Sequence, residues 1–549
     1  MAGNSARKWW ALVAIAASVL VVGLDLTGLN LALPTIATDL HASTSDLQWI
    51  SDSYSLVLAA AMLPAGLLGD RLGRKKVLLV ALVLFGASSA VCAYAGGTGE
   101  LIAGRAVLGI GAAAIFPLSL SVIPVLFAPE ERQRAIALMA SATFISFPIG
   151  PIVGGYLLDH FWWGSVFLIN VPVVVLAVIA VAILLPESRS AERPRIDAVG
   201  VILSSAGLAA LTYGFIKAGQ DGWSDSIAVG TIAAGVAVLA ALVAWERWLT
   251  GRNRAGNGGS LRGGVIRPLI ELRLFRSASF TWGTTLSTLV SFAMFGIFFA
   301  MPLYFQEVRG VNAMGSGLRL LPMIGGMVIG MIGSTRLASP RQAADGAAST
   351  PRASVKGLVT AGFAIMAVTL GVGATTTVSS GTGFAAAWFA VFGLGLGLAM
   401  PQTMNAALSA LSAETSGAGS ALISAMRQVG ATIGVAVLGT VLSSVYRSHL
   451  VVTGLPDSVA AAAKSSVVAG VAIAQKADSA PLLESVRHAF VSGMDALLWA
   501  CAGIALASAI LAVIFLPRRT EGGEAGTTGA GVADDVLDAS GAERAELEA

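Results

Sequence analysis

The stretch WWALVAIAASVLVVGLDLTGLNLAL, residues 9–33, holds the feature that decides the fold. It is apolar over a length that crosses a ~30 Å hydrocarbon layer as a single helix. One acid, Asp25, interrupts it. The stretch follows Arg7 and Lys8, as a signal peptide would, yet it runs on to Pro34 without a small-residue cleavage site. We therefore expect a retained membrane span.

The composition of the whole chain points the same way. Of 549 residues, 56% are hydrophobic and 12% are charged, whereas an ordinary soluble domain is about 25% charged. These values exclude a soluble enzyme, a disulfide-rich secreted domain and a disordered chain. Cys92 and Cys501 both lie inside apolar blocks, so no disulfide framework is expected. The net charge of +3 gives no indication of a nucleic-acid partner.

Fourteen apolar blocks of span length follow one another along the chain, and they predict an all-α integral membrane protein with 14 transmembrane helices. Their approximate limits are 9–33, 47–69, 76–97, 100–126, 135–158, 165–186, 197–218, 227–248, 278–305, 312–337, 355–377, 382–410, 416–446 and 489–517. With a cytoplasmic N-terminus, 25 of the 34 basic residues fall on the cytoplasmic side and seven outside. This asymmetry predicts that both termini are cytoplasmic.

The long connections separate the spans into groups. Residues 250–277 form a basic, glycine-rich cytoplasmic linker, in which 268–276 is expected to be a short interfacial segment. A second basic cytoplasmic loop covers 338–354, and the outer loop 447–488 is expected to contain a short helix or hairpin. The tail 518–549 is polar and is expected to be a disordered cytoplasmic end.

Charged residues inside spans are rare and costly, so each one is a functional candidate. Asp25, Asp52 and Arg105 fall in the outer halves of the first, second and fourth blocks, and we expect them to share one layer. A buried carboxylate beside a cation can exchange a proton or bind a cationic ligand. The alternative for Asp25 and Arg105 is an ion pair that only fixes helix packing. For Asp52 it is a solvated helix end.

Three secondary candidates lie in the second half of the chain. Arg427 is inside the thirteenth block, where it is either a functional group or a gate or packing residue. Asp495 is in the fourteenth block near the interface, and Glu307 is at the outer end of the ninth.

Four motifs stand at matching positions in the blocks: 24–36 (LDLTGLNLALPTI), 66–76 (GLLGDRLGRKK), 105–111 (RAVLGIG) and 146–155 (SFPIGPIVGG). Their ordered occurrence resembles the major facilitator superfamily, specifically the fourteen-helix drug:proton antiporters. Residues 49–58, 163–172 and 465–471 make the chain most similar to QacA-type exporters of cationic antiseptics and dyes. The resemblance covers the whole chain except the tail. It implies that Asp25 and Asp52 take part in proton coupling and cation handling.

The resemblance also implies two structural devices. The first is a conformational latch on the cytoplasmic side. The latch consists of Gly66, Asp70, Arg71, Gly73 and Arg74. Its glycines would form a tight turn, and its arginines would bridge neighbouring groups. The Asp70 carboxylate would face a helix N-terminus in the opposite half. The alternative is a plain basic loop. The second is the antiporter motif, in which close helix packing seals against proton leak; it consists of Gly150, Pro151, Gly154 and Gly155.

The chain departs from the QacA type in two spans. That type has further acids in its tenth and thirteenth helices, whereas 321–327 and 423–430 contain none here. This departure puts the handling of dicationic drugs in doubt.

These observations predict a major facilitator fold with an N-terminal six-helix half (1–195), an inserted helix pair without buried charge (196–249), the linker, and a C-terminal six-helix half (278–517). The expected function is a proton-coupled multidrug antiporter of the bacterial plasma membrane, a functional monomer that exports lipophilic, cationic compounds and uses no cofactor or metal. The alternatives are a dedicated exporter of one endogenous metabolite and a non-transporting membrane sensor. An enzyme is not expected, because the sequence has no metal cluster, nucleophile elbow or phosphate-binding loop.

Overall fold

The computed structural model describes residues 2–42, 44–188, 197–254, 269, 272–338, 353–411, 416–452 and 455–517. The described residues form helices and their connections. The elements are α1 (Ala2–Asp39), α2 (Thr44–Leu72), α3 (Arg74–Ala93), α4 (Thr98–Ser121), α5 (Ile123–Leu126), α6 (Pro129–His160), α7 (Ser165–Leu168), α8 (Asn170–Leu184), α9 (Ala198–Asp221), α10 (Ser226–Arg254), η2 (Leu272–Arg276), α11 (Ala278–Leu303), η3 (Tyr304–Val308), α12 (Ala313–Arg319), α13 (Leu321–Ala338), α14 (Val355–Gly373), α15 (Thr382–Ser409), α16 (Ser416–His449), α17 (Asp457–Ser465), α18 (Val467–Lys476) and α19 (Ala480–Phe515).

Thirteen stretches of the described residues are long and apolar enough to cross a membrane. They correspond to thirteen of the fourteen predicted spans. The remaining one, 135–158, lies within the continuous helix α6, several side chains of which are outside the description. The all-α membrane fold is confirmed, and the count of fourteen stays a prediction.

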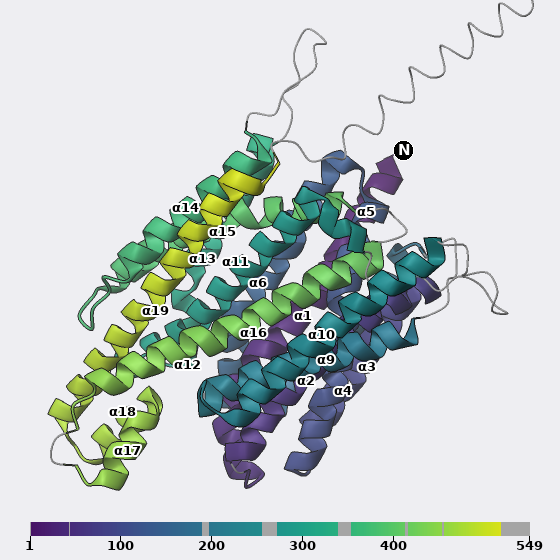
Figure 1. Cartoon of the computed structure of the whole chain (residues 1–549). Helices are drawn as coiled ribbons and strands as arrows, with labels where there is room; N and C mark the ends of the chain where they lie inside the picture. The colour runs from purple at the N-terminus through teal and green to yellow at the C-terminus, as the bar shows by residue number, and fades with distance from the viewer. Residues whose placement is uncertain are drawn as a thin grey trace, which may run out of the picture.

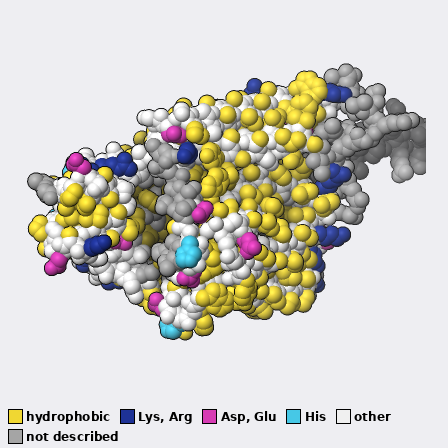
Figure 2. All heavy atoms as spheres, turned by 90° about the horizontal axis from the view of Figure 1, so that it is seen from below, with side chains coloured by type: hydrophobic (Ala, Val, Ile, Leu, Met, Phe, Trp, Pro, Cys, Tyr) yellow, Lys and Arg dark blue, Asp and Glu magenta, His cyan; other side chains and the backbone are white. Residues whose placement is uncertain are grey.

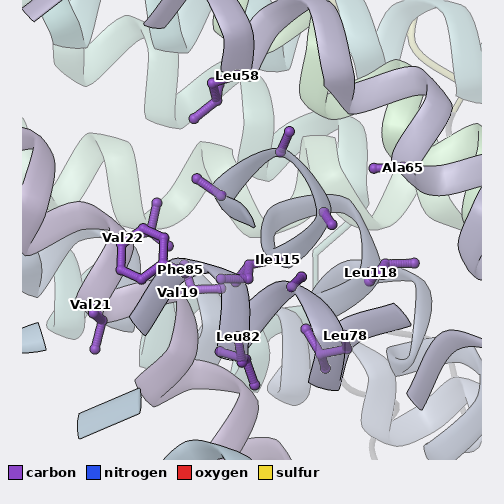
Figure 3. Packing of buried hydrophobic residues seen from close by; sticks show 14 of the residues in the cluster. Val19, Val21, Val22, Leu58, Ala65, Leu78, Leu82, Phe85, Ile115 and Leu118 are labelled. Carbon is purple, nitrogen blue, oxygen red and sulfur yellow. The ribbon is translucent and has the colours of Figure 1, made fainter. Parts of the chain in front are cut away.

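The helices form two bundles with separate cores. Helices α1 to α4 enclose one of them, which Figure 3 shows from close by: Val22 of α1, Leu58 of α2, Phe85 of α3 and Ile115 of α4 are buried together. The second core joins side chains of α11, α13, α14, α15, α16 and α19. The outer surface of the molecule is largely hydrophobic in the view of Figure 2, as a lipid-facing surface requires.

The two bundles meet at the end that carries the α2–α3 turn. There Ser420 of α16 donates a hydrogen bond to the Pro117 carbonyl of α4, at 3.1 Å. Residues from the start of α16, such as Ala421 and Ile423, share the core of the first bundle. At the opposite end, α17 and α18 form a lobe at the lower left of Figure 1. Seen from below in Figure 2, the surface is hollowed beside this lobe.

The helix pair α9–α10 lies at the side of the two bundles. Helix α9 packs against α2 of the first bundle and α16 of the second. The Trp223 indole donates to the Thr440 hydroxyl at 3.0 Å, and Tyr213 stacks with Trp49 at 6.2 Å between ring centroids. Helix α10 contacts mainly α9 and exposes large apolar side chains. The pair is therefore peripheral.

The predicted connections are found in part. Residues 272–276 form the short helix η2 inside the predicted segment 268–276. The loop 447–488 contains the two short helices α17 and α18, as expected. Most of 338–354 and all of the tail 518–549 lie outside the described residues.

Candidate functional site

The centre of the site is an ion pair inside the first bundle. Arg105 Nη1 of α4 donates to Asp25 Oδ2 of α1 at 2.5 Å. The two side chains are only 2% and 1% exposed. Sequence analysis placed both residues in one layer, and the structure brings them into direct contact. A paired charge this deeply buried interacts far more strongly than one at the surface.

Helix α2 contacts the Arg105 guanidinium from a second side. Arg105 Nε donates to the Ile50 carbonyl at 3.1 Å, and its guanidinium lies over the Tyr54 ring, 4.3 Å from the centroid. This approach depends on Gly109 of α4, because a Cβ there would lie 2.7 Å from the Tyr54 carbonyl oxygen. The small residues of the motif 105–111 therefore bring α4 against α2 and hold the guanidinium in place.

Sequence analysis missed Asn170, the first residue of α8. It is buried, and its Nδ2 donates to Asp25 Oδ1 at 3.4 Å and to Ser89 Oγ at 3.0 Å. Its Oδ1 is buried without a hydrogen-bond partner among the described residues. The Ser89 hydroxyl in turn donates to the Phe167 carbonyl at 2.9 Å. The sequence signal was a single amide side chain in the largely apolar motif 163–172.

Asp52 lies on α2 in the same layer. Ile50 and Tyr54, on either side of it, face Arg105. A residue two positions along a helix points ~200° away from its neighbour, so Asp52 lies on another face of α2. It is half-buried there.

The antiporter motif lies in α6, which packs along α1. A Cβ added to Gly154 would lie 3.5 Å from the Gly28 Cα and 3.4 Å from the Leu31 side chain, so the two backbones run close together. Gly150 and Gly155 are also buried, and the side chain of Pro151 is outside the description. The expected close packing beside Asp25 is therefore present at Gly154.

The α2–α3 turn contains a second buried ion pair. Asp70 Oδ1 accepts from Arg74 Nη2 at 2.7 Å and from Arg74 Nε at 3.1 Å. The Arg74 amide donates to the Ser188 carbonyl at 2.9 Å. The pair thus fixes the end of α2 to the start of α3.

The glycines of this turn lie in different positions from those that the sequence predicts. Helix α2 continues to Leu72, so Gly66 and Gly69 lie inside the helix and the turn is Gly73 alone, at φ 111°. Gly69 instead allows Leu118 of α4 to pack against α2. Arg71 is half-exposed, and the structure shows no bridging contact for it.

The secondary candidates lie apart from one another. Arg427 Nε donates to Ser291 Oγ at 3.2 Å. Asp495 Oδ1 is buried without a hydrogen-bond partner in the described part of the chain. Glu307 is half-buried in η3. None of the three contacts Asp25 or Arg105.

The prediction that the inserted pair lacks buried charge is wrong. Asp197 is 3% exposed and Glu246 is fully buried. Asp197 caps α9 by accepting from the Gly200 amide at 2.9 Å, and it also accepts from the Trp245 indole at 3.0 Å. Glu246 accepts from the Leu269 amide at 3.0 Å. Both acids stand at block ends, where the sequence does not distinguish a solvated end from a capped one.

Two helical bundles of membrane-spanning length, with an ion pair buried in one of them, define a multi-pass membrane protein. The family comparison agrees, because residues 15–435 match the model of the Major Facilitator Superfamily. The chain belongs to this superfamily, and the predicted resemblance to its drug:proton antiporters is confirmed.

The chain is similar over nearly its full length to curated proteins of bacteria. It is 32% identical over 531 residues to the tetracenomycin C resistance and export protein of Streptomyces glaucescens, covering 94% of this chain and 93% of that one. It is 33% identical over 534 residues to the multidrug efflux pump LfrA of Mycolicibacterium smegmatis, covering 93% and 97%.

Solved structures confirm the fold. The xylose symporter XylE, as a double Trp mutant, matches with a TM-score of 0.57 at 14% identity, over 94% of this chain and 97% of that one. The human organic anion transporter MFSD10 matches with a TM-score of 0.57 at 13% identity, over 93% and 98%. Membership of the Major Facilitator Superfamily indicates a transporter rather than an enzyme.

Proposed function

We propose that this protein is a proton-coupled multidrug antiporter that exports lipophilic, cationic compounds across the bacterial plasma membrane. The observation that carries the proposal is the Asp25–Arg105 ion pair, with 2.5 Å between its atoms and almost no exposure. A relative of similar length is named a multidrug efflux pump. In the proposed topology both termini are cytoplasmic, and the functional unit is the monomer.

Protonation of Asp25 is the proposed coupling step. A proton from the outer side neutralises the carboxylate, and Arg105 then loses its charged partner. The guanidinium retains the Ile50 carbonyl and the Tyr54 ring, so it can stay in place while α1 is released from it. Release of the proton to the cytoplasm restores the pair. The drug moves outward in the opposite direction through alternating access of the two halves.

The α2–α3 turn is the proposed latch. Asp70 and Arg74 are paired within the first half. At the same end, which is cytoplasmic in the proposed topology, the hydrogen bond from Ser420 to the Pro117 carbonyl joins the two halves. This arrangement fits an outward-facing state. Switching to the inward-facing state requires the contacts between the halves at this end to separate.

The proposed layout keeps the boundaries predicted from the sequence: an N-terminal half (1–195), the inserted pair (196–249), the linker (250–277) and a C-terminal half (278–517) with the outer loop 447–488. Asp52 is the proposed counter-charge for the cationic drug. It is half-buried, unlike Asp25, so a ligand reaches it more easily.

Drug-induced proton release from the purified protein tests the coupling. Wild-type protein should release protons when a cationic dye is added, and Asp25→Asn should bind the dye but release none. Efflux from cells should stop when a protonophore collapses the proton gradient at constant ATP. If Asp25→Asn released as many protons per dye as wild type, Asp52 would be the next candidate. Full efflux in the presence of the protonophore would exclude antiport altogether.

A dedicated exporter of one endogenous metabolite is the second candidate. The 32% identity to a protein named for tetracenomycin C resistance and export favours it. A panel of chemically unrelated drugs separates the two. Expression of a multidrug pump raises the resistance of a sensitive host to several classes, whereas a dedicated exporter protects against one.

A further inference from the structure

Arg427 is a cation in the second bundle that the Asp25 network does not use. It lies eight residues after Gly419, where the apolar span of α16 begins. At 1.5 Å per residue this is ~12 Å along the axis, close to the middle of a ~30 Å hydrocarbon layer. In the part of the chain that the structure describes, its polar partner is the Ser291 hydroxyl, at 3.2 Å.

A single neutral hydroxyl is a poor partner for a guanidinium at this depth. The group carries five N–H donors, of which Nε uses one. A cation in a span is costly unless it is paired or faces a hydrated space. The Arg427 side chain remains partly exposed, and α16 packs against both α11 and the N-terminal helices α2 and α4. The remaining N–H donors of Arg427 therefore lie on a helix at the interface between the two halves.

Buried hydroxyls accompany the arginine. Ser287 lies one turn before Ser291 on α11, and Ser424 lies one turn before Arg427 on α16. Both are buried, and neither hydroxyl has a hydrogen-bond partner among the described residues. A buried polar group without a partner costs about 1–3 kcal/mol. Each of the two hydroxyls lies one turn from a partner in the Arg427–Ser291 contact, so a ligand that binds Arg427 can also complete their hydrogen bonds.

We propose that Arg427, with Ser287, Ser291 and Ser424, forms a subsite for an oxyanion on the exported compound, such as a carboxylate or an ionised phenol. A guanidinium binds a carboxylate through two parallel hydrogen bonds, and hydroxyls can donate to the same oxygens. The inference rests on the proposed function only in that the chain binds an exported small molecule. It adds that preferred substrates carry an acidic oxygen group together with the cation.

Equilibrium binding to the purified full-length protein tests the subsite. The two probes are a rhodamine with a free carboxylate and its methyl ester, and binding is followed by fluorescence anisotropy. Arg427→Gln should weaken binding of the free acid by about tenfold or more, because a charge-assisted hydrogen bond contributes about 1.5–3 kcal/mol and 1.4 kcal/mol is tenfold. Binding of the ester should change less than twofold.

Two further variants complete the design. Arg427→Lys keeps the charge without the planar fork and should give an intermediate loss for the acid. Arg447→Gln removes an exposed arginine from the far end of the same helix and should leave both probes unaffected. If Arg427→Gln does not fold, Ser424→Ala, which removes one hydroxyl donor, should weaken the acid alone.

An equal loss for acid and ester would mean that Arg427 only supports packing, and no loss for either would also overturn the subsite. Binding is measured without a proton gradient, so its outcome is separate from that of the coupling experiment. If the acid–ester difference holds but no protons are released, the subsite stands and antiport fails. If wild type binds neither probe, the subsite proposal is rejected.

Discussion

At the scale of single residues, Arg105 is the group on which the buried network depends, because it contacts Asp25, the Ile50 carbonyl and the Tyr54 ring at once. Arg105→Gln should lower the free energy of unfolding by about 3–5 kcal/mol, since it leaves a buried carboxylate without its cation. The double variant with Asp25→Asn should recover most of this loss. The coupling energy between the two residues is obtained from thermal unfolding, in detergent, of the wild type, the two single variants and the double variant. Losses that simply add would show that the two residues act independently.

Asn170 is predicted to set the pH response of Asp25 without contacting the drug. Removing its Nδ2 donor in Asn170→Ala makes the ionised carboxylate less favourable. The pH profile of drug-induced proton release should move to higher pH, while dye affinity stays within about twofold, less than 0.5 kcal/mol. Ser508→Ala, which removes a buried hydroxyl from α19 in the second bundle, is the control. An unchanged pH profile of proton release, together with lower protein stability, would show that Asn170 only supports packing.

The charges in this site could be predicted from the sequence, and the amide could not. Asp25 and Arg105 stand out because an ionised group in an apolar block is costly enough to need a reason. A lone Asn costs much less to bury, so Asn170 gave little signal. Its role depends on the distance between α8 and α1, which only the packed bundle fixes.

At the scale of elements, the α2–α3 turn is predicted to control switching. Asp70→Asn weakens the bidentate contact with Arg74 far from the residues at the interface between the halves that would bind drug. Transport should fall at least tenfold, or about 1.4 kcal/mol in the rate-limiting step, while dye binding remains. Lys76→Gln, at an exposed position in the first turn of α3, should transport normally. Loss of binding in Asp70→Asn with an unchanged conformational equilibrium would contradict the latch.

The element boundaries show where patterns are ambiguous. Block lengths located the spans, but Gly66, predicted to form the turn, lies inside α2, and Gly69 in the same helix allows Leu118 to pack. Among the glycines of this motif, Gly73 has the backbone that requires glycine, because its φ is 111°. The same ambiguity hid Asp197 and Glu246. An acid at a block end is a solvated group or a cap depending on what packs over it.

At the scale of the whole molecule, the distribution of charge predicts a preference among substrates. The first bundle provides Asp52 as a counter-charge for a cationic drug. In the described part of the second bundle, α13 and α16 contain no acid, and α16 carries the Arg427 cation. The second charge of a dication would lie near that cation or remain unpaired in a low-dielectric space. Monocations should be exported at least several-fold faster than dications of similar size. Equal efflux rates for matched pairs of dyes would count against this.

The position of α9 has a consequence for how compounds reach the central path. This helix contacts α2 through Tyr213 and α16 through Trp223. It therefore covers the interface between α2 and α16, one of the two interfaces between the halves, on the side that faces the lipid. We therefore expect a compound dissolved in the bilayer to be hindered from entering between α2 and α16. We expect it to enter instead along the other interface between the halves, where α6 packs against α12, α13 and α15.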